Sequence, residues 1–147
     1  MLDNPNPIVT EIVEMTYKRP TGMLDSNDIF NVIRNIRDPE HPYTLEQLKV
    51  VSCSQILIDT DTKALIIRFT PTVPHCSLTS LIGLMIRVKL MRYLPSCIKI
   101  HILIQEGTHY QEKEINKQLN DKERVAAAME NIHLMEVVEY NIGEWMQ

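Results

Sequence analysis

The segment Pro71-Thr72-Val73-Pro74-His75-Cys76 combines a thiol, an imidazole and two prolines, and it is the part of this 147-residue chain best suited to chemistry. Cys76 directly precedes a helix predicted to begin at Ser77, and the free amides and positive dipole of a helix N-terminus stabilise a thiolate. The prolines restrict the loop that holds His75 beside the thiol. Such a cysteine can serve as a nucleophile, a metal ligand or an iron–sulfur ligand; alternatively, it is a small buried hydrophobe near a helix cap.

A second candidate for chemistry, His109, follows Gly107-Thr108 at the end of another predicted strand. If the two strands are parallel neighbours, the loops that follow them emerge at the same edge of the sheet, and His75, Cys76 and His109 could converge there. Glu136, from the last predicted helix, could then complete a site for a transition metal, because borderline metals accept thiolate, imidazole and carboxylate ligands. The alternative is that these are unrelated surface histidines.

The run Asp121-Lys122-Glu123-Arg124 is charged on all sides of a predicted helix and leads into Val125-Ala126-Ala127-Ala128-Met129. A charge run of this kind is usually a solvated helix face. The alternative is a docking surface for a partner protein, with Asp121, Lys122, Glu123 and Arg124 as the contact residues.

The cysteine count bears on the compartment in which the protein works. Cys53, Cys76 and Cys97 are an odd number without a CxxC spacing, which argues against a disulfide framework and against a closed zinc site. Cys53 and Cys97 fall in predicted strands, where we expect them to pack in the core. The first residues lack the basic region and the apolar core of a secretory signal. We therefore expect a cytoplasmic location and leave access to the nucleus open.

Charge, hydropathy and motifs exclude several classes of function. The net charge of −4 gives no electrostatic reason to expect direct nucleic-acid binding. The longest apolar stretch, Leu81 to Ile86, is far shorter than the ~20 residues that span a bilayer. Walker, dinucleotide-glycine, HExxH and GxSxG motifs do not occur. We therefore predict that the protein is not an enzyme, while a thiol enzyme with Cys76 as its nucleophile stays open.

Hydrophobic periodicity and breaker residues predict the elements that position these side chains. They are a helix from Asp25 or Ser26 to Asp38-Pro39, strands over 50–58, 64–69 and 97–104, a long helix over 77–94, and helical pieces near 112–130 and 134–140. Residues 1–24, with three prolines and little periodicity, predict a flexible N-terminal arm. Gly83 lies inside the long helix, where glycine costs roughly 1 kcal/mol relative to alanine, so we expect close packing to offset that cost.

The order of these elements predicts the fold. The first two strands form an antiparallel hairpin, and strand, helix, strand over 64–104 form a parallel crossover. We therefore predict an α+β fold, a small mixed three-stranded sheet with helices packed mainly on one face, in a single domain over 25–147. Three strands leave sheet edges open, which makes a homodimer or an exchange of elements feasible.

Two long motifs carry a resemblance to a known family. They are residues 68–84 (RFTPTVPHCSLTSLIGL) and residues 116–131 (NKQLNDKERVAAAMEN). Together with Ile36-Arg37-Asp38-Pro39-Glu40 and Glu106-Gly107-Thr108-His109, they closely resemble the eukaryotic component-two family of the cytosolic iron–sulfur assembly (CIA) targeting machinery, the MIP-eighteen-like proteins. The resemblance covers residues 26–140, nearly the whole predicted domain.

The resemblance implies a function that spacing alone does not give. Members of this family are non-enzymatic adaptors that bind a WD-repeat propeller protein and help deliver iron–sulfur clusters to cytosolic and nuclear apoproteins. The family's reactive cysteine lies in its proline-histidine-cysteine loop, which is Cys76 here. The motif does not settle whether Cys76 binds a cluster or transition metal transiently, senses redox state or shapes a binding surface.

The family has two branches, and the sequence carries features of both. Val73, the approach Ile104-Gln105-Glu106-Gly107 and Ala128-Met129-Glu130 resemble the A branch, which we favour. The first residues and the stretch 133–138 resemble the B branch. The B branch also joins a HEAT-repeat adaptor and serves enzymes of DNA metabolism, whereas the A branch is linked to a narrower client set that includes the iron regulatory protein related to aconitase.

Overall fold

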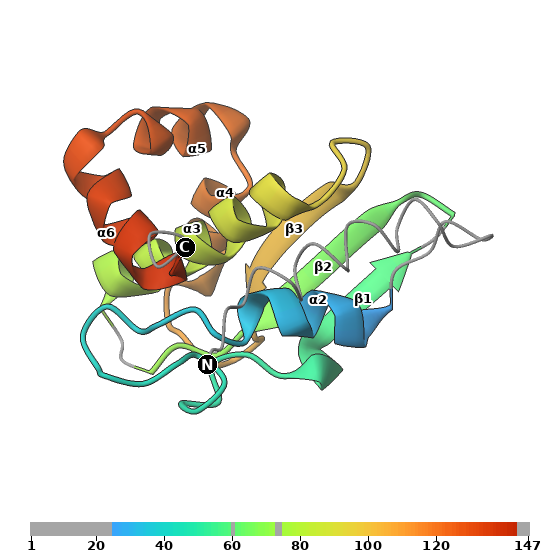
Figure 1. The fold of residues 1–147 in the computed structure, drawn as a ribbon, viewed down its shortest axis with the longest axis horizontal. Coiled ribbons are helices and arrows are strands. Elements are labelled where there is room, and N and C mark those ends of the chain that lie inside the picture. The colour runs from blue at the N-terminus through green and yellow to red at the C-terminus, as the bar shows by residue number, and fades with distance from the viewer. Residues whose placement is uncertain (1–24, 60, 73–74, 144–147) are drawn as a thin grey trace.

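The structure is a computed structural model that describes residues 25–59, 61–72 and 75–143, so the predicted arm over 1–24 and two loop residues, Val73 and Pro74, lie outside the described residues. The described elements, in chain order, are α2 (Ser26–Ile33), the 3-10 helix η1 (Cys53–Gln55), β1 (Ile56–Asp59), β2 (Ala64–Phe69), α3 (Cys76–Tyr93), β3 (Lys99–Ile104), α4 (Glu112–Leu119), α5 (Lys122–Met129) and α6 (Ile132–Ile142) (Figure 1). Among these helices, none combines the length and the apolar content needed to cross a membrane.

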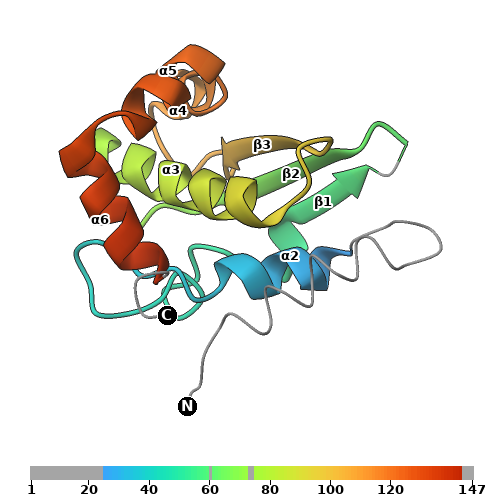
Figure 2. The same ribbon diagram turned by 45° about the horizontal axis from the view of Figure 1, so that its top comes forward.

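The sheet is mixed and has the strand order β1-β2-β3. β1 pairs antiparallel with β2, and β2 pairs parallel with β3, with Phe69 opposite Ile104 at the ends of the two parallel strands. α3 is the crossover that joins them. Alternate residues of β2 are buried, and α2 and α3 pack against each other and against the sheet on that side (Figure 2). The predicted α+β fold, with a hairpin and a parallel crossover strand, is confirmed.

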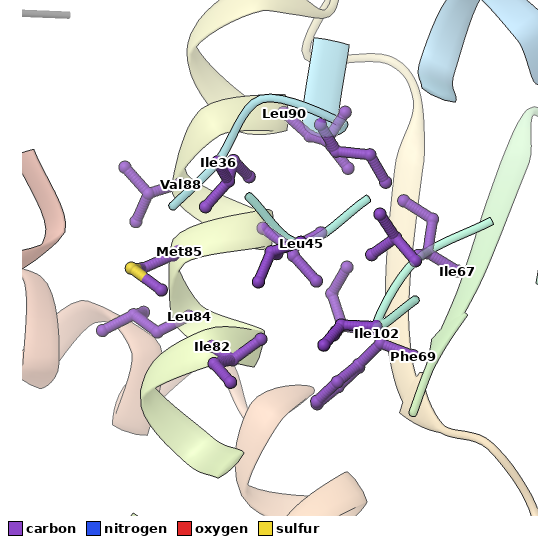
Figure 3. Close-up of a cluster of buried hydrophobic side chains, with 14 of the residues drawn as sticks. Ile36, Leu45, Ile67, Phe69, Ile82, Leu84, Met85, Val88, Leu90 and Ile102 are labelled. Atoms are coloured by element: carbon purple, nitrogen blue, oxygen red, sulfur yellow. The ribbon is translucent and has the colours of Figure 1, made fainter. Parts of the chain in front are cut away.

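Helix α3 forms the centre of the core and is buried on most of its circumference rather than along one stripe. Its side chains meet those of the sheet and of the segment after α2 in one apolar cluster, shown in Figure 3 by Ile82, Leu84, Met85, Val88 and Leu90 from α3, Ile67, Phe69 and Ile102 from the sheet, and Ile36 and Leu45. Close packing of this kind resists displacement. The first residue of α3, Cys76, therefore has a well-defined position relative to the sheet.

The strand predicted over 50–58 is wrong in its first half, because only Ile56–Asp59 is a strand. Val50 and Val51 are both buried in a loop, so the apparent alternation does not reflect alternating burial. Lys49 adopts a positive φ of 60°, a conformation that ends regular extended structure. The carbonyl of Val50 accepts a hydrogen bond from the Thr70 amide at 2.9 Å, which ties this loop to the end of β2.

Two cysteines do not pack in the core as predicted. Cys53 lies in η1 and is half-buried, and its thiol donates a hydrogen bond to Oδ1 of Asn27 at 3.1 Å. Cys97 lies in the turn before β3 and is exposed. Both predictions failed for the same reason: the strands begin later in the chain than the alternation of apolar residues suggests.

The helical stretch predicted over 112–130 is two helices, with a break at Asn120-Asp121. Asp121 caps α5, because its carboxylate accepts hydrogen bonds from the amides of Glu123 and Arg124. Asn120 ends α4 and turns its side chain towards β3. In a continuous helix, the backbone groups at this point would form hydrogen bonds within the helix. Because the side chains of Asn120 and Asp121 form hydrogen bonds with backbone groups instead, the break costs little free energy.

Asn116 of α4 and Asn120, the residue that follows this helix, cover the free edge of β3. The Asn120 amide accepts from the Ile102 N–H at 3.0 Å and donates to the Ile102 carbonyl at 2.8 Å, as a neighbouring strand would. One turn earlier, Asn116 accepts from the Ile104 N–H at 2.7 Å. An uncovered edge is a template for unwanted strand pairing. The edge that we expected to be open is therefore blocked along its second half.

Helix α6 is anchored to α3 by two basic side chains. Lys89 is 3% exposed, and its ammonium donates to the carbonyl of Ile142, the last residue of α6, at 2.9 Å. Arg92 forms a bidentate ion pair with Glu139, at 2.7 and 3.0 Å. The hydrogen bond to Arg92 lowers the pKa of the Glu139 carboxyl. A cation at the C-terminal end of a helix is also favoured by the helix dipole.

Gly83 is a position where α3 packs closely against Leu119 of α4. A Cβ atom placed there would lie 2.5 Å from Cδ1 of Leu119, which confirms that close packing requires this glycine. Gly83→Ala should therefore destabilise the protein by about 1–3 kcal/mol, although alanine favours helix. In a Leu119→Ala background the same change should be neutral or stabilising, because the clash is gone. Urea unfolding of the four proteins measures this; an additive cycle would contradict the packing account.

Candidate functional site

The site lies where two helices begin at the same edge of the sheet. β2 and β3 end in register, and the loops after them lead to α3 and α4 (Figure 1). α3 begins at Cys76 with His75 as its N-cap, and α4 begins at Glu112 with Gln111 as its N-cap. Neither cap residue uses its side chain to bond its own helix. The predicted convergence of the two loops is confirmed.

The thiol of Cys76 contacts the loop that precedes α4. Its Sγ atom donates a hydrogen bond to Oε1 of Gln111. A hydrogen bond with Cys76 is the main cause that raises the pKa of the Tyr110 hydroxyl. This phenol is therefore a second neighbour of the thiol. Cys76 itself is half-buried, while Tyr110 is 76% exposed. The sulfur is therefore held between an amide and a phenol and remains accessible from solvent.

His109, which precedes Tyr110 and Gln111 in the same loop, is largely shielded from solvent. It is 7% exposed, and its ring stacks on Tyr110 with centroids 5.0 Å apart. The Gln111 amide N–H donates to His109 Nδ1 at 2.9 Å, so a neutral ring carries its proton on Nε2. Nε2 is buried and has no hydrogen-bond partner among the described residues. In this arrangement His109 positions Gln111 and offers no lone pair to a metal.

The four candidate metal ligands do not gather into a metal site in the described part of the chain. Across residues 25–59, 61–72 and 75–143, no group of three or more His, Cys, Asp or Glu side chains could hold a metal ion. His75 is exposed at the N-cap of α3, and Glu136 lies on α6, where its carboxylate is 3.6 Å from Nδ1 of His133. Cys76 and His109 belong to neighbouring loops. A metal at Cys76 would need ligands from elsewhere.

Two buried hydroxyls belong to the loop and helix around Cys76. Thr79 is fully buried one turn into α3, and its Oγ1 has no partner among the described residues. Thr72, in the loop before Cys76, also has a buried Oγ1 without a partner in that part of the chain. A buried polar atom without a partner costs free energy. Together with His109 Nε2, these hydroxyls are buried polar atoms without a hydrogen-bond partner among the described residues.

The charged run Asp121 to Arg124 forms the N-cap and first turn of α5, and Arg124 lines a pocket together with Ser77, the residue that follows Cys76. Asp121 is half-buried and Lys122, Glu123 and Arg124 are exposed. Arg124 lies 3.9 Å from Asp121 within the same turn, a contact that stabilises little in solvent. The run remains a candidate for partner binding.

Sequence reasoning missed Gln111 and Tyr110, the two residues that touch the thiol. Neither belongs to a pattern that marks a site, since glutamine and tyrosine are common on surfaces. The available signal was their place directly after His109, because any residue of that loop was expected to emerge beside the loop that carries Cys76.

Comparison with known proteins is consistent with this geometry. No protein-family profile matches the chain. The mouse protein "Cytosolic iron-sulfur assembly component 2B" is 47% identical over 148 residues, which are 94% of this chain and 89% of the mouse protein. The Drosophila melanogaster "MIP18 family protein galla-2" is 57% identical over 114 residues, or 78% of this chain and 73% of that protein. "Protein AE7" of Arabidopsis thaliana is 47% identical over 146 residues, 94% of this chain and 93% of that protein.

These relatives show the family to which the chain belongs, but they do not support the predicted branch. The mouse relative carries the letter B, so its name gives no support to the A branch that the sequence favoured. Identity of this size over most of both chains is far above what fold similarity alone produces. The chain is therefore a member of the MIP18 family of cytosolic iron–sulfur assembly components.

Proposed function

We propose that this protein is a non-enzymatic adaptor that helps deliver iron–sulfur clusters to cytosolic and nuclear apoproteins through protein–protein contacts. The observation that carries the proposal is family membership over nearly the whole chain, with relatives named as cytosolic iron–sulfur assembly components. The expected partners are a WD-repeat propeller protein of the assembly machinery, apoprotein clients and a HEAT-repeat adaptor. The expected location is the cytoplasm, with access to the nucleus.

The surroundings of Cys76 favour an adaptor over a thiol enzyme. A nucleophilic thiol needs an adjacent general base and a third group that orients the base. Here the acceptor of the Cys76 S–H is an amide oxygen, and the His109 imidazole of the neighbouring loop uses its Nδ1 lone pair to accept from Gln111. Among the described residues, no hydrogen bond joins the thiol to an imidazole, which supports the adaptor proposal.

The same surroundings suit transient binding of an iron–sulfur cluster. An accessible thiol at a helix N-terminus can supply one ligand to an iron–sulfur cluster or a transition metal in transit. Because the described residues offer no complete ligand set, the remaining ligands would come from a client or another partner. Such a cluster is cargo in this proposal rather than a resident cofactor.

A pull-down with the WD-repeat propeller protein tests the adaptor proposal. The tagged full-length chain, kept in reducing buffer, should retain the propeller protein from a cell extract and in a mixture of the two purified proteins. Retention in the purified mixture is the critical result, because it excludes bridging by a third protein. Failure to associate in that mixture would overturn the proposed partner and, with it, the adaptor role.

A further inference from the structure

A groove lies between α5, the second half of α3 and the first residues of β3. Its volume is about 600 Å³. The groove borders Ile98 to His101 at the start of β3. Helix α3 begins, at Cys76, near the other end of that strand (Figure 1). Its apolar lining consists of Met91, Leu94, Ile98, Ile100, Val125 and Met129.

Every ionisable side chain that lines this groove is basic. They are Arg87, Lys99, His101 and Lys122, and no aspartate or glutamate of the described residues lines it. Lys99, His101 and Lys122 are exposed. The chain as a whole carries a formal charge of −4, so this groove has the opposite sign to the rest of the surface. Local charge of this kind attracts a partner of complementary charge.

Arg87, at the floor of the groove, carries its charge without a carboxylate partner among the described residues. Its Nε donates to the Leu119 carbonyl at 3.0 Å, and its Nη2 donates to the Ile100 carbonyl at 3.0 Å and to Oδ1 of Asn120 at 2.8 Å. These acceptors are all neutral. Burial lowers the pKa of Arg87, which is the direction expected for a cation without a counter-charge. A carboxylate brought into the groove would supply that counter-charge.

The edge of β3 decides how an occupant can bind. Asn116, Asn120 and Arg87 already bond its outward backbone groups from the Ile100 carbonyl to the Ile104 amide. A peptide cannot add to the sheet as a fourth strand along that stretch. An occupant must therefore be held by apolar side chains against the groove and by ion pairs at its rim.

We propose that this groove docks an acidic segment of a partner protein, one that carries apolar side chains between its carboxylates. The proposal rests on the adaptor function, for which it names one contact surface and the chemistry of its partner. Lys99 and Lys122, from β3 and α5, form the exposed rim, and Arg87 forms the charged floor. Lys122 belongs to the charged run that sequence analysis singled out for partner binding.

A second copy of this chain is the competing occupant. An acidic groove lies along α6 and the end of α5, with Glu130, Glu136 and Glu139 in its lining and Ile132 and Tyr140 exposed. A contact between the acidic groove of one copy and the basic groove of another joins two different surfaces. Such a head-to-tail contact does not close within a pair of copies and leads to rings or filaments. A partner of different sequence fits the groove without this consequence.

Zero-length carbodiimide cross-linking tests the proposal, because it joins an amine only to a carboxylate in direct contact. The tagged full-length chain, captured with its partners, is cross-linked, and the linked peptides are identified by mass spectrometry. We expect Lys99 and Lys122 to be joined to Asp or Glu of another protein. Lys113 and Lys117, which are exposed on α4 outside the groove, should not be joined to the same segment.

A matched pair of double variants makes the test quantitative. Lys99→Glu with Lys122→Glu should weaken binding of the cross-linked partner about tenfold to a hundredfold, because two exposed ion pairs are replaced by repulsion. Lys113→Glu with Lys117→Glu changes the net charge equally and should leave the affinity unchanged. All four lysines are exposed, so both proteins should fold normally, which circular dichroism checks.

Each alternative outcome has a distinct meaning. Equal affinity of the two double variants, or cross-links at Lys113 and Lys117 alone, would overturn the groove while leaving the adaptor function intact. Links from Lys99 or Lys122 to Glu130 or Glu136 of a second copy would assign the groove to self-association and overturn the partner proposal. Capture of no partner by the unaltered chain would overturn both proposals.

Discussion

Cys76→Ser should abolish iron–sulfur loading of cytosolic client proteins while leaving the protein folded. Serine retains a donor for Oε1 of Gln111, the acceptor of the Cys76 S–H, and it is well tolerated at the start of a helix. A hydroxyl, however, does not ionise near neutral pH and is a poor ligand for iron. In cells that depend on the variant, cluster occupancy of the clients should fall to the level of cells without the protein. The thermal unfolding midpoint of the purified variant should remain near that of the unaltered chain.

Cys97→Ser is the matched control for this experiment. It makes the same chemical change at an exposed thiol outside the site, so client loading should be unaffected. If Cys76→Ser supports loading as well as Cys97→Ser does, the thiol is a packing residue near a helix cap, and the functional role assigned to it is wrong.

Asn120→Ala should cause a large loss of stability. It removes both partners of the Ile102 backbone and one acceptor of Arg87. Each backbone group or charge left without a partner costs about 1–3 kcal/mol when buried, and partial access of water reduces that cost. We therefore expect a loss of about 2–4 kcal/mol in the free energy of unfolding, measured by urea denaturation.

Two further variants separate the hydrogen bonds from the general effect of substitution on α4. Gln118→Ala, at an exposed position of the same helix, should change stability by no more than about 0.5 kcal/mol. Asn120→Asp keeps an acceptor for the Ile102 amide and for Arg87 but loses the donor, so its stability should lie between those of Asn120→Ala and the unaltered chain. A loss for Asn120→Ala no larger than that for Gln118→Ala would show that the β3 edge does not depend on this side chain.

Sequence patterns placed the thiol correctly because its position follows from rules of chain topology. The strand, helix and strand over 64–104 predict a parallel crossover, and parallel strands end at the same edge of the sheet. That rule brought the Cys76 loop beside the loop of His109. Helix α3 begins one residue earlier than predicted, which places Cys76 inside the first turn rather than before it.

Sequence patterns did not predict the places where side chains form hydrogen bonds with the backbone of another element. They also did not predict which polar residues are buried. Asn120 and Asp121 are compatible with a helix in sequence, yet their hydrogen bonds to β3 and to the α5 backbone divide the predicted helix in two. Lys89 is buried because it bonds the C-terminal end of α6, a contact 53 residues away that periodicity cannot reveal. Spacing also gave no indication that His109 accepts from the Gln111 amide or that Glu136 lies beside His133, because it does not encode side-chain orientation.

Cluster occupancy in cells depleted of this protein tests the central claim most directly, because it asks whether cytosolic iron–sulfur proteins depend on the chain. Occupancy is measured for a panel of cytosolic apoproteins and, as the internal control, for a mitochondrial iron–sulfur enzyme in the same cells. The account predicts that depletion lowers occupancy of cytosolic proteins, that re-expression of the unaltered chain restores it, and that the mitochondrial enzyme is unaffected. Unchanged occupancy across the cytosolic panel after complete depletion would contradict it.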